Sequence, residues 1–121
     1  MREDPSRHVV FLTGDLIFSS RAEAIAQRTN VTIHAVAGDE RAVAACGEFS
    51  VEILIVDLTA PGIDVARLIP RIRAIPHSPR IVCYAPHIRA DLLSAAMAAG
   101  CDLVLTRGQF DARLGDILSG A

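Results

Sequence analysis

Asp57 is the residue whose type and position most clearly indicate chemistry. It ends the run Ile-Leu-Ile-Val-Asp at residues 53–57, which is apolar, β-branched and too short for a helix. Such a run predicts a strand buried on both faces, as at the centre of a parallel sheet. Ligands of open α/β sheets bind beyond the carboxyl ends of the strands, near the point where the strand order reverses. A carboxylate there is a candidate site residue, and Pro61 and Gly62 are typical of the turn that follows it.

The other residues that could do chemistry form no recognisable set. The three cysteines have no CxxC spacing and lie in apolar stretches, which predicts free thiols in a reducing compartment. The four histidines are scattered, no serine has a base at triad-like spacing, and no glycine-rich phosphate loop follows the first apolar run. We therefore expect no zinc site and no enzymatic turnover, and we expect the cytoplasm as the location.

The composition is that of a single small domain. The chain has 121 residues, of which 51% are hydrophobic and 21% are charged, and its formal net charge is −2. No apolar run approaches the ~18 residues that a membrane helix needs, and this net charge gives no general attraction to nucleic acid or to an anionic membrane. Because every basic residue is an arginine, an arginine at a candidate site carries less information than it would in another chain.

Strand-like and helix-like segments alternate along the chain. Strands are predicted over residues 9–12, 31–36, 53–57, 80–85 and 102–105. Helices are predicted from a Ser19 or Ser20 cap to about residue 29 and over residues 40–46, 63–74, 89–99 and 110–118, with a kink or an early stop at Pro70. Five such units with short connections predict a parallel sheet with helices on both faces.

With these units in place, the chain resembles the receiver domain of bacterial two-component response regulators, the CheY-like family. The resemblance rests on length, on the five units, on IVDLTAPGID at the third strand and on AMAAGCDLVLTRGQF at residues 96–110. Asp57 and Pro61 have the spacing of the family's phospho-accepting aspartate and a following proline. The resemblance covers residues 8–119 as one domain, after a lead-in at residues 1–7. It implies a doubly wound, flavodoxin-like three-layer sandwich with strand order 2-1-3-4-5.

Several positions depart from the family's pattern. The pair of acids that holds Mg²⁺ at the end of the first strand is matched by Thr13 and Gly14, with Asp15 one place late. The hydroxyl residue at the end of the fourth strand is matched by Ala85, and the lysine after the fifth strand by Arg107.

Asp15 and Asp57 are then only weak metal candidates, and we expect no resident metal or cofactor. These departures predict a pseudo-receiver, in which Arg107 pairs with Asp57 and holds one conformation.

The resemblance also implies a protein partner, such as a histidine kinase, an effector domain, another regulator or a second copy of the chain. The face that the family commonly uses is carried here by the fourth helix, the fifth strand and the fifth helix. Its apolar residues are Leu92, Leu93, Met97, Val104 and Phe110, some of which must serve the core instead.

Three other interpretations remain open. The chain could be a functional receiver that is phosphorylated on Asp57 with Mg²⁺, or a flavodoxin-like domain that binds a small ligand or cofactor. Asp57 could also do no more than cap the turn that follows it, by accepting backbone N–H bonds. Next to these candidates, Tyr84 is expected to be a packed aromatic residue with its hydroxyl at the surface.

Overall fold

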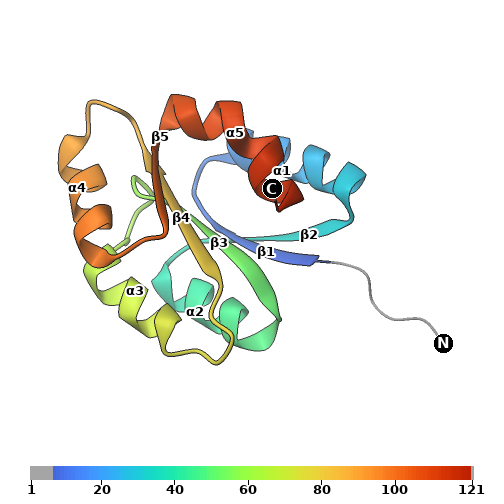
Figure 1. Ribbon diagram of the computed structural model, residues 1–121, viewed down its shortest axis with the longest axis horizontal. Helices are drawn as coiled ribbons and strands as arrows, with labels where there is room; N and C mark the ends of the chain where they lie inside the picture. Colours follow the sequence, from blue (N-terminus) through green and yellow to red (C-terminus); the bar gives the residue numbers. More distant parts are fainter. Residues whose placement is uncertain (1–6, 121) are drawn as a thin grey trace.

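The computed structural model describes residues 7–120, in which five parallel strands form one sheet. The strand order is β2-β1-β3-β4-β5, and the helices lie on both sides of the sheet (Figure 1). This confirms the doubly wound α/β fold and the strand order that the resemblance implied. The expected lead-in at residues 1–7 lies outside the described residues, except for Arg7, which begins β1.

The elements alternate regularly along the chain. The strands are β1 (Arg7–Leu12), β2 (Val31–Val36), β3 (Val51–Asp57), β4 (Arg80–Ala85) and β5 (Leu103–Thr106). The helices are α1 (Leu16–Thr29), α2 (Asp39–Glu48), α3 (Val65–Arg73), α4 (Ala90–Ala99) and α5 (Arg107–Ser119). Within residues 7–120, no helix combines the length and the apolar character that crossing a membrane requires.

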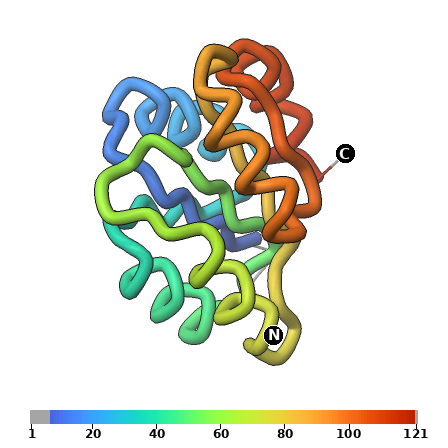
Figure 2. Tube along the Cα trace, turned by 90° about the vertical axis from the view of Figure 1, so that its left-hand side faces the viewer, coloured from blue at the N-terminus to red at the C-terminus, as the bar shows by residue number. Residues whose placement is uncertain are grey.

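The sheet separates two layers of helices. Helices α1 and α5 cover one face, and α2, α3 and α4 cover the other (Figure 1). Helix α3 lies between α2 and α4, which Figure 2 shows from the side. In β3, Ile53 and Ile55 face the first layer, whereas Leu54 and Val56 face the second. The strand is therefore buried on both faces, as its unbroken apolar run predicts.

The two cores differ in composition. The core beneath α2, α3 and α4 is aliphatic, whereas the core beneath α1 and α5 contains Phe11, Phe18, Tyr84 and Phe110. The rings of Tyr84 and Phe110 stack with their centroids 4.1 Å apart and their planes within 2°. Tyr84 is fully buried together with its hydroxyl oxygen, so the expectation that this hydroxyl reaches the surface is wrong.

The starts of α1 and α5 differ from the predictions. Helix α1 begins at Leu16 and is capped by Asp15, not by a serine, because the Asp15 carboxylate accepts hydrogen bonds from the N–H groups of Ile17 and Phe18. Helix α5 begins three residues before the predicted start, since Thr106 forms a capping box with Gln109. Helix α3 continues past Pro70 to Arg73.

Candidate functional site

Asp57 is the last residue of β3, at the carboxyl end of the central strand. Only 3% of the residue is exposed, and it lies in register with Tyr84 on β4. Side chains alternate between the faces of a sheet, so Asp57 shares a face with Ile55 and Ile53, toward the aromatic core. The fold therefore places this carboxylate at the edge of the sheet where α/β folds bind ligands.

Neutral donors hold both oxygens of the Asp57 carboxylate. The Thr13 hydroxyl donates to Oδ2 over 3.1 Å. The Thr59 hydroxyl and backbone N–H donate to Oδ1 over 2.7 and 3.0 Å. The bond from the Thr59 N–H is the turn-capping bond that the sequence analysis left open, and an Asp followed two residues later by Thr is the local signal for it. None of these donors carries a charge.

Arg107 binds Asp15 and not Asp57. Its Nη2 donates to Oδ2 of Asp15 over 2.5 Å, and its guanidinium carbon lies 4.7 Å from the centroid of the Phe18 ring. The predicted pair between Arg107 and Asp57 is therefore wrong. The physical reason is the early start of α5: Arg107 stands in the first turn of that helix, beside the start of α1, where Asp15 is already fixed as the cap.

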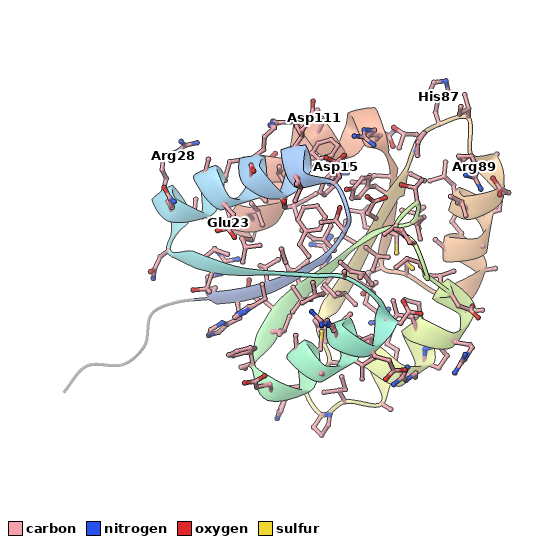
Figure 3. The ribbon with its side chains drawn as sticks, turned by 180° about the vertical axis from the view of Figure 1, so that it is seen from behind. Asp15, Glu23, Arg28, His87, Arg89 and Asp111 are labelled. Carbon is pink, nitrogen blue, oxygen red and sulfur yellow. The ribbon has the colours of Figure 1, made fainter. Side chains whose placement is uncertain are left out.

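Of the two site carboxylates, Asp15 and Asp57, Asp15 is the one that has a charged partner. Burial alone would raise its pKa, but hydrogen bonds from the N–H groups of Phe18 and Ile17 and from the Arg107 guanidinium lower the pKa of Asp15 below its usual value. Figure 3 shows Asp15 at the start of α1; Asp111 of the neighbouring α5 lines a pocket together with Phe18 and Arg107. His87 lies at the outer end of the loop between β4 and α4, away from Asp15 (Figure 3).

Gly14 and Ala85, two other predicted site residues, place no polar side chain beside Asp57. Gly14 contributes no side chain, and Ala85 is fully buried in the aliphatic cluster on the opposite face of the sheet. The residue of β4 that lies beside Asp57 is Tyr84. Burial, and after it the negative charge of Asp57, raises the pKa of Tyr84, so the phenol is neutral. Tyr84 and Ala85 are neighbours on β4, so their side chains point to opposite faces of the sheet. The aromatic ring of Tyr84, and not Ala85, therefore lies next to the Asp57 carboxylate.

The carboxylate oxygens at the carboxyl ends of the strands do not form a ligand set that fits a magnesium ion. Mg²⁺ prefers octahedral oxygen ligands and is usually bound through one or two carboxylates. The Asp57 oxygens accept from Thr13 and Thr59, and the Asp15 oxygens accept from the start of α1 and from Arg107. In the described part of the chain, no group of three or more His, Cys, Asp or Glu side chains could hold a metal ion.

The predicted interaction face is divided between the surface and the core. Met97 on α4 is 68% exposed, whereas Leu92, Leu93 and Val104 are half-buried against the aliphatic cluster. Phe110 is fully buried in its stack with Tyr84. It therefore belongs to the core and not to the exposed face on which the sequence analysis placed it.

The chain is similar to known proteins in structure and not in sequence. No family model matches the sequence, and no curated protein matches it. Among solved structures, the receiver domain of a sensor histidine kinase from Pseudomonas aeruginosa PAO1, with a magnesium ion coordinated in its active-site cleft, superposes with a TM-score of 0.78. That match has 18% identity and covers 95% of this chain and 96% of the other. The chain has the receiver-domain fold.

Two further receiver structures agree with this match. A response regulator from Hahella chejuensis superposes with a TM-score of 0.77 at 18% identity, over 93% of this chain and 92% of the other. The receiver domain of a response regulator from Saccharomyces cerevisiae, crystallised with a histidine phosphotransfer protein, has a TM-score of 0.70 at 15% identity, over 88% and 81%. At these identities the likeness is one of fold.

Proposed function

We propose that this chain is a receiver-like signalling module that acts by binding another protein, and that Asp57 does not accept a phosphoryl group efficiently. The observation that carries the proposal is the setting of Asp57, whose carboxylate is held by the uncharged groups of Thr13 and Thr59. The partner would be a histidine kinase, an effector domain, another regulator or a second copy of the chain. The module would act in the cytoplasm and without turnover of its own.

The chemistry of phosphoryl transfer supports this proposal. Transfer depends on positioning the phosphoryl group and on neutralising its charge with metal ions and cations. Thr13 stands next to Asp57 where an acidic metal ligand would be needed, and the nearby cation of Arg107 is bound to Asp15. An anionic donor would therefore approach the Asp57 carboxylate with little compensation of charge.

The direct test is incubation with acetyl phosphate and Mg²⁺, followed by intact mass spectrometry. We expect no gain of a phosphoryl group within the time in which a functional receiver is modified. Asp57→Asn is the matched control, because it removes the acceptor with little change in volume. A prompt gain of one phosphoryl group that the control lacks would establish the phospho-accepting alternative instead.

A gain-of-function variant sharpens this test. Thr13→Asp combined with Gly14→Asp places two carboxylates at the end of β1. A Cβ on Gly14 would lie 3.7 Å from Cδ of Pro61, an ordinary contact, so the backbone at this position accepts a side chain. We expect the double variant, unlike the native chain, to be stabilised against thermal unfolding by Mg²⁺. Equal stabilisation of both proteins by Mg²⁺ would contradict the proposed loss of the metal site.

The output surface is proposed to be the exposed part of α4 together with β5. Met97 on α4 has 68% of its area exposed, and Val104 on the neighbouring β5 is half-buried against the aliphatic cluster. Sedimentation velocity of the native chain and of Met97→Glu tests whether a second copy binds there. Concentration-dependent dimerisation that Met97→Glu abolishes would support self-association through this surface, and dimerisation that the variant leaves unchanged would exclude it.

A further inference from the structure

Cys83 and Cys101 lie in direct contact although they are distant in the sequence. Cys83 is on β4, and Cys101 lies in the connection between α4 and β5. Their sulfur atoms are 2.8 Å apart, and both are free thiols. Cys83 is fully buried in the aliphatic cluster, whereas Cys101 is partly accessible. A disulfide bond needs sulfur atoms at ~2.05 Å, so closing this one requires a small movement.

The backbone around the pair is held in place by several hydrogen bonds. Asp102 donates its N–H to the carbonyl oxygen of Ile81 over 3.0 Å and accepts the Ile81 N–H on Oδ2 over 2.8 Å. Arg73 donates to the same carboxylate and to the carbonyl oxygen of Gly100. Ile81 and Cys83 are two residues apart on one strand and therefore share a face. The hydrogen bonds between Asp102 and Ile81 thus hold Cys101 within contact distance of Cys83.

The two thiols have different acidities. The hydrogen bond from the Cys83 thiol and, to a smaller extent, the charge of Arg73 lower the pKa of Cys101. The same hydrogen bond and burial raise the pKa of Cys83. Reactions with peroxide use the thiolate and need access from solvent. Cys101 is the more acidic and the more accessible of the two thiols, whereas Cys83 is fully buried.

We propose that Cys83 and Cys101 are a redox site that a hydroperoxide converts into an intramolecular disulfide. The Cys101 thiolate attacks the peroxide, the O–O bond breaks, and Cys101 becomes a sulfenic acid while the leaving oxygen takes up a proton. The Cys83 sulfur then attacks the sulfenic sulfur, the S–O bond breaks, and water leaves with the Cys83 proton. With hydrogen peroxide the net reaction turns two thiols and one peroxide into one disulfide and two waters.

The disulfide would fix the edge of the sheet that carries α4. The segment 83–101 that it closes contains all of α4, which packs on β4 and β5. A cross-link of this kind removes conformational freedom mainly from the unfolded chain. We expect the oxidised protein to melt about 5–10 °C above the reduced protein, and a dithiol reductant should reverse the shift.

The experiment treats the reduced native protein with stoichiometric hydrogen peroxide and then alkylates the remaining thiols. Intact mass and non-reducing peptide mapping should show a loss of two hydrogens, a linkage between Cys83 and Cys101, and alkylated Cys46. Cys46→Ser is the matched control and should form the same bond. Cys83→Ser should leave a sulfenic acid on Cys101 that a cyclic dione traps.

Two outcomes would overturn the proposal. One is a native protein that keeps three alkylatable thiols after this treatment, as measured on the unmutated chain. The other is a linkage that involves Cys46 or joins two chains. Both readouts use the native protein, so they remain decisive even if Cys83→Ser does not fold.

Discussion

Two carboxylates lie at the same end of the sheet, one at the end of β3 and one at the start of α1, and the chain holds them differently. Asp57 is almost fully buried, and its partners are the neutral groups of Thr13 and Thr59. Asp15 is half-buried and binds the guanidinium of Arg107 and the first N–H groups of α1. Helices α1 and α5 pack side by side, so Asp15 at the start of α1 lies next to Arg107 at the start of α5. Arg107 therefore binds Asp15 and not Asp57.

This difference explains how the fold can keep a buried acid without a charged partner. Burying an ionised carboxylate is costly unless hydrogen bonds compensate. At Asp57 three donors from two residues supply that compensation. At Asp15 the positive end of the α1 dipole and the Arg107 guanidinium compensate the carboxylate charge.

Removal of the Thr13 hydroxyl should have the largest effect. Thr13→Val deprives the Asp57 carboxylate of a donor and the Asp15 N–H of its acceptor, which is the same hydroxyl oxygen at 2.8 Å. We expect the free energy of unfolding in urea to fall by about 2–3 kcal/mol. Thr13→Ser keeps the hydroxyl and should lose much less. Equal losses in the two variants would show that the bond to Asp57 contributes little.

Two substitutions of Asp15 should separate its role as the cap of α1 from its ion pair with Arg107. Asp15→Ala removes the cap of α1 and the ion pair with Arg107, and we expect a loss of about 1–2 kcal/mol in urea unfolding. Asp15→Asn keeps a good capping group and should lose less than about 1 kcal/mol. If asparagine cost as much as alanine, the ion pair would be the dominant interaction and the cap would not.

Neutralisation of Asp57 should raise stability. Asp57→Asn removes a buried charge that has no cationic partner but keeps an oxygen that can accept from Thr59. We expect a gain of up to about 1 kcal/mol in the free energy of unfolding. In the Thr13→Val background the gain should be greater, since the neutral amide that Asp57→Asn introduces depends less than the Asp57 carboxylate on the hydrogen bond from the Thr13 hydroxyl. A clear loss of stability in Asp57→Asn would show that the carboxylate charge is compensated by more than these hydrogen bonds.

Acidification should reduce the difference between the native chain and Asp15→Asn. The pKa of Asp15 is lower in the folded chain than in the unfolded one. Its contribution is therefore complete above the unfolded value of about 3.9 and is lost as the pH falls through the folded value. Urea unfolding at pH 7 and at about pH 3 should show the two proteins converging. A difference that grew on acidification would have the wrong sign for this carboxylate.

Much of the fold could be predicted because it follows local patterns. The unbroken apolar run before Asp57 indicated a strand buried on both faces, and β3 is buried on both faces. The alternation of strands and helices, together with the receiver resemblance, led to the strand order. Helix starts were predicted less well. Asp15 caps α1, although Ser19 or Ser20 was the predicted cap, and Thr106 caps α5, although the predicted start was Phe110.

The candidate site could be predicted only in part. Asp57 and Thr13 do lie together, but Tyr84 and Thr59, which also border the carboxylate, were not assigned to the site. The register between β3 and β4 decides that Tyr84 and not Ala85 faces Asp57. A strand has a side-chain period of two, so an error of one residue moves every side chain to the other face.

The sequence by itself determined the order of the elements, the burial of the central strand and the place of Asp57 at its end, because these depend on neighbours along the chain. The tertiary structure alone decided that Arg107 binds Asp15, that Phe110 stacks on Tyr84 and that Cys83 meets Cys101. These contacts join residues from different elements, and they depend on strand register and on helix packing, which no short stretch of sequence encodes.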